Sequence, residues 1–183
     1  SLLNMMDNLI DLTLIETGAL KLNEDMVEVY PLVKELYNHF NQDRYRVNRE
    51  RIAFLLNVRE SIREARIIAD KERLSRALNC LLDNALTQTK KGVVEFGVSF
   101  AVKNKLVFTV KDSSSMLLQD RARKVFETDV IEEDWYNTSD TIGLGYKLAR
   151  GLAEAMDGEI TVSDSSFKGT TIEFSIPVRM VTP

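Results

Sequence analysis

Residues 71–90 carry the feature that most limits what this chain can fold into. Apolar side chains recur there every three or four positions, which is the spacing of one face of an α-helix. A helix with such a face must bury it against another layer of structure, so we expect a core helix here. The 183 residues suffice for one such domain with a helical appendage. The apolar face comprises Leu74, Ala77, Leu78, Leu81, Leu82, Ala85 and Leu86.

Alternating apolar and polar side chains predict several strands. Two of them follow the core helix directly, and we expect an antiparallel pair joined near Asn104. Pro177 ends the last strand. The predicted strands are residues 26–30 (an edge strand), 52–58, 65–69, 94–100, 106–111, 160–162 and 172–176.

Helical spacing predicts three further helices, over residues 2–14, 31–40 and 143–156. Thr17-Gly18 and Gly158 are the expected stops of the first and the last. We expect an exposed connection or helix end at 41–51, and a long loop with one short helix at 117–126. Hairpin-paired strands with helices on one face predict a two-layer α/β sandwich.

The amino-terminal helix carries an apolar stripe of Leu2, Met5, Leu9 and Leu12, widened by Met6 and Ile10. A helix this short is unstable alone in water, so it needs a partner. We expect the stripe to drive self-association in a helix bundle. The alternative is that the helix folds back onto its own domain.

Charge and cysteine content limit the function and the compartment. The formal net charge of -4 provides no basic stripe for a phosphate backbone, so we expect no nucleic-acid binding. Cys80 is the single cysteine and cannot form an internal disulfide, which favours the cytosolic side. Ser1 opens directly into a helical pattern, so we expect the cytoplasmic part of a longer protein that could be membrane-anchored.

Three polar features are candidates for a binding site. Asn84 lies on the inward part of the core helix, where a buried amide needs a hydrogen bond or a ligand. Asp112 ends a strand, where a carboxylate either caps a turn or accepts a hydrogen bond from a ligand amine. Gly143-Leu144-Gly145 opens a helix, and is either an ordinary turn or a site where backbone N–H groups meet phosphate.

The motifs over residues 70–177 together resemble the histidine-kinase branch of the ATPase superfamily that includes gyrase, the Hsp90 chaperones and MutL. Residues 9–18, Leu-Ile-Asp-Leu-Thr-Leu-Ile-Glu-Thr-Gly, resemble the end of the second helix of the kinase dimerisation domain. We therefore expect residues 1–20 to end a dimerisation helix and residues 21–183 to form the ATP-binding domain. The matching runs are Leu78-Asn79-Cys80-Leu81-Leu82-Asp83-Asn84-Ala85 (asparagine box), Val110-Lys111-Asp112 (first glycine box), Val125-Phe126-Glu127 (phenylalanine box), and 142–149, 156–160 and 168–174 (second glycine box and closing hairpin).

The resemblance implies a Bergerat-type ATPase fold, whose sheet is mixed and largely antiparallel. It also implies that the chain binds ATP with Mg²⁺ and transfers the γ-phosphoryl to a histidine upstream of residue 1. It implies that Asn84 coordinates Mg²⁺ and that Asp112 contacts the adenine amino group. Gly143, Leu144 and Gly145 would line the phosphates, with Thr170 supporting Asp112 through water. The implied partners are the chain's own dimerisation domain, a response regulator, and a second copy in a homodimer of the full-length protein.

Several residues depart from the family's pattern. Cys80 replaces an asparagine, Thr87 a basic residue and Gln88 an aromatic one, while Ser114 and Met116 replace two glycines. An acidic run, Glu132-Glu133-Asp134, lies in the long loop. His39, the single histidine, lacks the acidic neighbour and proline of a phosphoacceptor, so we expect an ordinary surface or half-buried residue. These losses support an alternative function, a degenerate kinase domain that docks and relays signals without productive ATP use.

Overall fold

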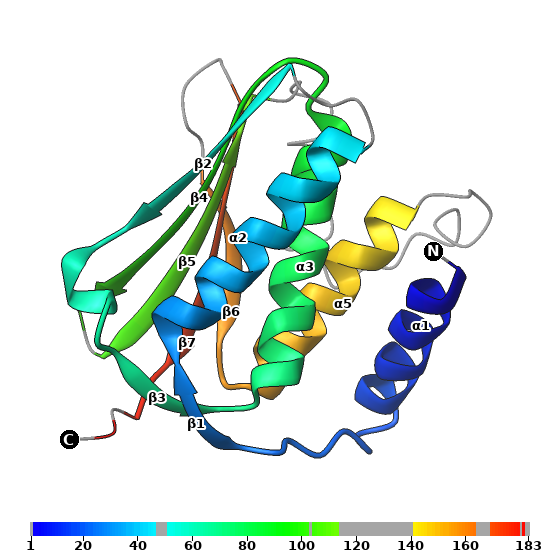
Figure 1. The fold of residues 1–183 in the computed structure, drawn as a ribbon. Coiled ribbons are helices and arrows are strands. Elements are labelled where there is room, and N and C mark those ends of the chain that lie inside the picture. Colours follow the sequence, from blue (N-terminus) through cyan, green and yellow to red (C-terminus); the bar gives the residue numbers. More distant parts are fainter. Residues whose placement is uncertain are drawn as a thin grey trace.

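A computed structural model describes residues 2–46, 51–102, 104–113, 141–163, 169–179 and 181. Its elements follow the predicted order, and the expected helix at 117–126 lies outside the described residues. Figure 1 shows the arrangement. The elements are α1 (Leu2–Glu16), β1 (Asp25–Glu28), α2 (Val29–Arg46), β2 (Ile52–Val58), the 3-10 helix η1 (Glu60–Ile62), β3 (Arg66–Ala69), α3 (Lys71–Gln88), β4 (Gly92–Ala101), β5 (Lys105–Asp112), α5 (Thr141–Ala155), β6 (Glu159–Ser163) and β7 (Thr170–Pro177).

Five strands form the main sheet in the order β2-β4-β5-β7-β6. The pairs β4–β5, β5–β7 and β6–β7 are antiparallel. β2 and β4 pair in parallel because the chain crosses back through β3 and α3 between them. The sheet is therefore mixed and largely antiparallel, as predicted.

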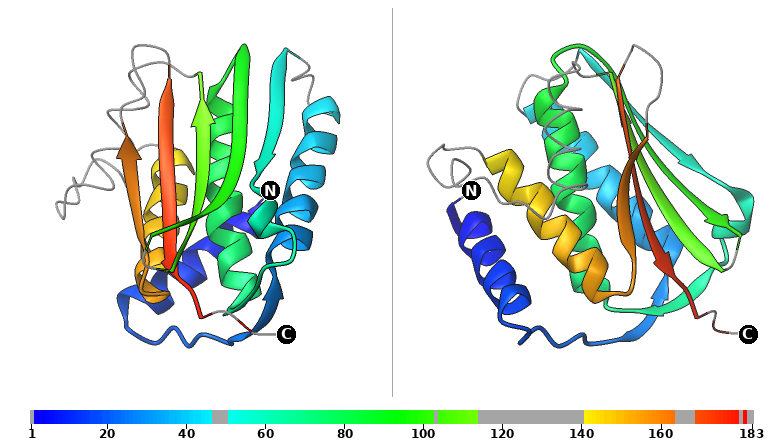
Figure 2. Two further views of the ribbon diagram at one scale, coloured as in Figure 1. Left: turned by 90° about the vertical axis from the view of Figure 1, so that its left-hand side faces the viewer. Right: turned by 180° about the vertical axis from the view of Figure 1, so that it is seen from behind.

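Helices α2, α3 and α5 cover one face of the sheet, which confirms the predicted two-layer α/β fold (Figure 2). Phe96, Phe108 and Phe174 from β4, β5 and β7 are fully buried beneath them. The ring centroids of Phe96 and Phe108 lie 6.5 Å apart, and those of Phe108 and Phe174 5.8 Å apart. Leu74, Leu78 and Leu81 of α3 are also buried, so the apolar face of the core helix closes this core as expected.

The predicted first strand does not join the main sheet. β1 pairs with β3 in a separate two-stranded antiparallel sheet, and α2 already begins at Val29. The chain after β7 extends this small sheet, because Ile68 donates to the Arg179 carbonyl at 3.2 Å and Val181 to the Arg66 carbonyl at 3.1 Å. Arg179 also forms an ion pair with Glu24 at 2.6 Å. The small sheet thus joins the start and the end of residues 21–183, the predicted ATP-binding domain.

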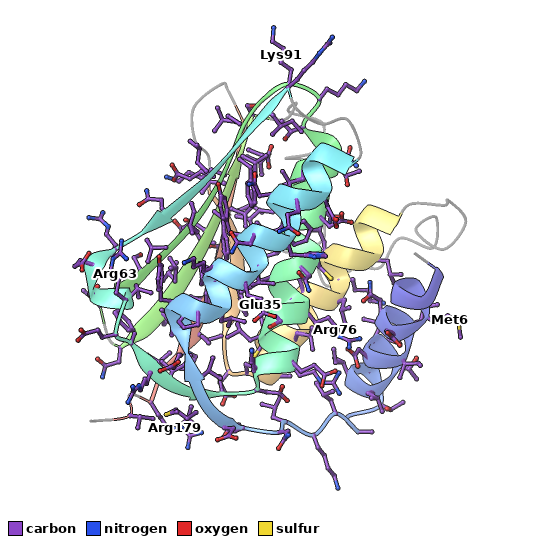
Figure 3. The ribbon with its side chains drawn as sticks, viewed as in Figure 1. Met6, Glu35, Arg63, Arg76, Lys91 and Arg179 are labelled. Carbon is purple, nitrogen blue, oxygen red and sulfur yellow. The ribbon has the colours of Figure 1, made fainter. Side chains whose placement is uncertain are left out.

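α1 lies on the side of the helix layer away from the sheet, next to α5 (Figures 1 and 2). Leu12 is buried, and a Cβ added to Gly151 of α5 would lie 3.1 Å from the Ile15 side chain. Helix α1 therefore folds back onto its own domain, the alternative left open above. Met6, Leu9 and Ile10 remain about half exposed, and Figure 3 shows Met6 pointing away from the domain. The side chains of Leu2 and Met5 lie outside the described residues.

Two helices end away from the predicted residues. α2 continues past the expected end at Phe40 to Arg46, so residues 41–46 are a helix end, one of the two alternatives expected for 41–51. α5 is closed by Asp157, which adopts a left-handed conformation with φ 57°. Gly158 follows and donates to the Ala153 carbonyl at 2.8 Å. Among the described residues, no helix combines the length and apolar character needed to cross a bilayer.

Candidate functional site

Asn84 lies at the contact between α3 and α5. Asp70 caps the start of α3 by accepting a hydrogen bond from the Arg73 N–H at 3.0 Å, which fixes the helix that carries the asparagine. Asn84 is 5% exposed. A Cβ added to Gly145 would lie 3.3 Å from Nδ2 and 3.5 Å from Oδ1 of Asn84. Two of the predicted site residues are therefore direct neighbours.

The start of α5 differs from the prediction. The helix begins at Thr141, so Gly143 is its third residue and Gly145 its fifth. Only the first four N–H groups of a helix lack a partner within it. Gly143, Leu144 and Gly145 lie in the first two turns of the described helix, and their contact with phosphate stays a prediction. Because Gly145 has no side chain, α5 can lie close to the Asn84 amide.

Asp112 is the last residue of β5, in the interior of the sheet. Its Cα partners are Val94 on β4 and Thr170 on β7, so Thr170 lies directly opposite it. Asp112 and Thr170 are both buried. A Cβ on Gly169 would overlap with the Asp112 carbonyl oxygen, so only glycine allows this closeness of the two chains. The carboxylate is thus held at the end of a rigid strand.

Tyr146 belongs to the site and was missed in the sequence. It follows Gly145 on α5 and is buried. Burial, reinforced by the negative charge of Asp112, raises the pKa of Tyr146 above its usual range. The phenol therefore stays protonated and is a potential hydrogen-bond donor near the carboxylate. The signal that could have revealed it is an aromatic residue directly after the second glycine of the motif.

Of the departures from the family, Cys80, Thr87 and Gln88 lie on α3 and are described. Thr87 is exposed, whereas Cys80 is buried one helical turn before Asn84. Cys80 lines a cavity of about 850 Å³ between α1, α2 and α3. Ser114, Met116, the phenylalanine box and the acidic run at 132–134 lie outside the described residues. His39 is 65% exposed at its side chain and lies 3.4 Å from Asp43, as expected of a surface residue.

Cys80 should be inert in the folded chain. Burial, with a smaller effect of the Asp83 charge, raises its pKa from 9.0 to about 12. We expect a thiolate-selective reagent to label native protein at pH 8 far more slowly than unfolded protein. The unfolded chain loses the proton first, so the contribution of the thiol to stability should fall as pH rises above about 9. Denaturant unfolding against pH measures this fall, and Cys80→Ala, which has no thiol, should lack it.

The sequence and the fold of this chain were compared with known proteins, and both resemble histidine kinases. A family model described as "Histidine kinase-, DNA gyrase B-, and HSP90-like ATPase" matches residues 69–180. The signal transduction histidine-protein kinase BaeS of Escherichia coli is 28% identical over 181 residues, which cover 98% of this chain and 37% of BaeS. The aerobic respiration control sensor protein ArcB of Escherichia coli is 28% identical over 179 residues, which cover 94% of this chain and 22% of ArcB.

Solved structures show the same fold. Full-length ShkA in complex with AMPPNP gives a TM-score of 0.79 at 21% identity, covering 100% of this chain and 37% of ShkA. The Acinetobacter baumannii histidine kinase AdeS gives 0.69 at 18% identity, covering 95% of this chain and 77% of AdeS. The chain thus spans little more than a third of BaeS and about a fifth of ArcB.

Proposed function

The chain belongs to the family of histidine kinase-, DNA gyrase B- and HSP90-like ATPases, and we propose that it is the catalytic ATP-binding part of a sensor histidine kinase. It transfers the γ-phosphoryl of ATP to a histidine of its dimerisation domain, outside these 183 residues. The full-length protein acts as a homodimer on the cytoplasmic side, and its partner is a response regulator. One observation carries the proposal. Asn84 on α3 lies against Gly145 on α5, near the described start of that helix.

The chain's own residues bind the two ends of the nucleotide. The Asp112 carboxylate accepts a hydrogen bond from the adenine amino group, with Thr170 beside it on β7. The backbone of Gly143, Leu144 and Gly145 lines the phosphates, which the positive end of the α5 dipole also attracts. Catalysis then rests on positioning the γ-phosphoryl and stabilising its charge.

The residues present fit a magnesium ion that is held jointly with ATP. Mg²⁺ prefers oxygen ligands and takes few from the protein when phosphates and water supply the others. Asn84 offers an amide oxygen at the α3–α5 contact. Within the described residues, no group of three or more His, Cys, Asp or Glu could hold a metal without the nucleotide. When bound, the ion would offset the negative charge of the phosphates.

Asn84→Ala tests the proposal. We expect calorimetric titration of the 183-residue chain to show binding of a nonhydrolysable ATP analogue that strengthens with Mg²⁺. Asn84→Ala should remove this Mg²⁺ dependence, because its proposed role is coordination, and should weaken binding by about tenfold or more.

Asn57→Ala is the control. Asn57 is an exposed asparagine on β2, at the edge of the main sheet, so its removal should leave nucleotide binding unchanged. Equal Mg²⁺ dependence in wild type and Asn84→Ala would exclude Asn84 as a ligand. No binding by the wild-type chain would instead favour the docking module, in which the loss of an asparagine at Cys80 disables the site.

A further inference from the structure

β5 ends at Asp112, and the next residue, Ser113, bonds to β4 partly through its side chain. In an antiparallel pair, two opposite residues can exchange both of their N–H···O=C bonds. Ser113 lies opposite Val93, one step beyond the Val94–Asp112 pair. Its N–H donates to the Val93 carbonyl at 3.1 Å. The return bond from the Val93 N–H, however, goes to the Ser113 hydroxyl Oγ at 3.0 Å.

The Ser113 hydroxyl thereby takes the place that its own carbonyl would have in the ladder. Val93 keeps a partner for its N–H, and the Ser113 carbonyl is released from this pairing. β5 accordingly ends at Asp112. The hydroxyl also donates to the Lys91 carbonyl at 3.4 Å, which ties the turn to both sides of Gly92.

Two glycines leave the space that the Ser113 side chain and the Asp112 backbone occupy. Gly92 has φ 125°, and a Cβ there would overlap with Ser113 Oγ. A Cβ on Gly169 would overlap with the Asp112 carbonyl oxygen and lie 3.1 Å from Ser113 Cα. Asp112 and Ser113 are therefore enclosed between β4 on one side and the start of β7 on the other. Their backbone has little freedom to shift.

We infer that Ser113 is a positioning residue for Asp112. The Ser113 hydroxyl ends the β4–β5 pairing directly after Asp112 and thereby fixes the direction of the Asp112 carboxylate. The consequence for ligand choice rests on the proposed function. A carboxylate held in place accepts a hydrogen bond from a purine 6-amino group and is repelled by a 6-oxo group, which is an acceptor. Ser113 therefore contributes to the preference for ATP over inosine triphosphate.

Ser113→Val and Ser113→Thr form the test, because the two side chains have the same shape and only threonine keeps the hydroxyl. In the nucleotide-free chain, amide exchange at Val93 should accelerate about tenfold in Ser113→Val and stay unchanged in Ser113→Thr. The ¹³C shift of the Asp112 carboxyl should move in the valine variant only. Ser113 is exposed, so both variants should fold.

The affinity ratio of ATP to inosine triphosphate gives the functional outcome. It should fall about tenfold in Ser113→Val and be retained in Ser113→Thr. Ser75→Ala removes a similar bond, from Oγ to the Lys71 carbonyl at 2.7 Å on α3, and should change none of these readouts.

Equal Val93 exchange and an equal Asp112 carboxyl shift in the valine and threonine variants would overturn the inference, whatever the nucleotide results. A wild-type chain that does not distinguish ATP from inosine triphosphate would instead refute the adenine contact of Asp112. The exchange and carboxyl measurements need no nucleotide, so they would still decide the role of Ser113.

Discussion

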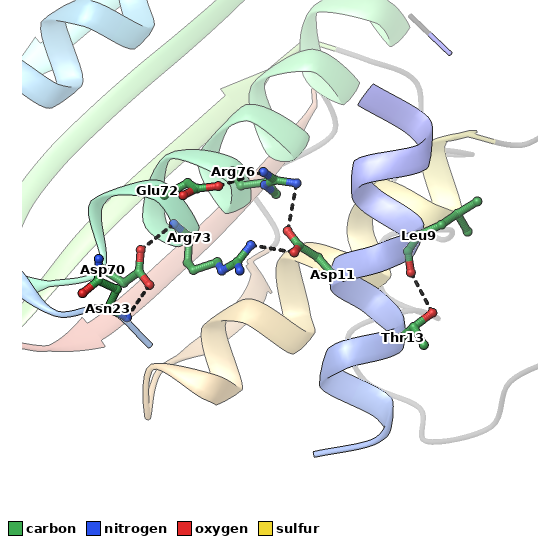
Figure 4. A network of polar contacts seen from close by, with 8 residues as sticks. All are labelled: Leu9, Asp11, Thr13, Asn23, Asp70, Glu72, Arg73 and Arg76. Atoms are coloured by element: carbon green, nitrogen blue, oxygen red, sulfur yellow. Dashed lines mark hydrogen bonds and ion pairs between the residues drawn. The ribbon is translucent and has the colours of Figure 1, made fainter. Parts of the chain in front are cut away.

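Asp11→Ala is expected to detach α1 from the domain, at a cost of about 3 kcal/mol in docking free energy. Asp11 is buried and contacts two arginines of α3 (Figure 4). Its Oδ1 lies 2.5 Å from Arg73 Nη1 and its Oδ2 2.9 Å from Arg76 Nη1. Removing the carboxylate leaves two guanidinium groups facing an apolar helix. The arginines are 18% and 22% exposed and can partly turn to water, which sets the cost at the low end for a broken buried pair.

Hydrogen exchange measures this detachment, because a free helix of 15 residues is barely stable in water. Amides of α1 should lose protection in Asp11→Ala while those of α3 and the main sheet keep theirs. Asp7→Ala is the control, since Asp7 is exposed on the same helix and should change stability by less than about 0.5 kcal/mol. Unchanged protection of α1 in Asp11→Ala would show that apolar contacts alone hold it.

Gly158→Ala is expected to lower the free energy of unfolding by about 3 kcal/mol, the upper end for an overpacked core. A Cβ at this position would overlap with the Ser175 carbonyl oxygen of β7. It would also lie 2.8 Å from Ile176 Cγ2 and 3.2 Å from the Ala153 carbonyl oxygen. Both α5 and β7 are fixed by buried side chains, so neither element can retreat.

Gly18→Ala separates this clash from backbone strain. Gly18 has φ 67°, but nothing lies within 4 Å of an added Cβ, so only the left-handed conformation is penalised, at about 1–2 kcal/mol. Denaturant unfolding of both variants gives the comparison. If Gly158→Ala lowers the free energy of unfolding by no more than Gly18→Ala does, the backbone around Gly158 can shift to accommodate the added Cβ, contrary to this prediction.

Local periodicity predicted most elements, because a helix or strand that buries one face carries apolar residues at a regular spacing along the sequence. β2 was predicted at its observed bounds. The parallel pairing of β2 with β4 and the separate β1–β3 sheet were not predicted, since partners far apart in sequence leave no local pattern. The start of α5 was placed at Gly143, two residues late, because glycine is a poor helix former and gives no sign that the helix starts before it.

The site was predicted in part for the same reason. Asn84 stood out as a polar residue on an apolar face, but its contact with Gly145 joins two helices that no motif relates in space. Ser113 opens a run of three serines and gives no signal of its own. Its role depends on Val93, 20 residues earlier, and on the two glycines beside it.

The strand order has a consequence for biosynthesis. β7, the last strand along the chain, lies in the interior of the sheet between β5 and β6. In the described structure β6 pairs with β7 alone, so α5 and β6 have no completed sheet to join until residue 177 has left the ribosomal tunnel. A nascent chain therefore exposes the apolar sides of β5, α5 and β6 until β7 has emerged. Ribosome stalling in that interval would yield a product that chaperones and proteases recognise as unfolded.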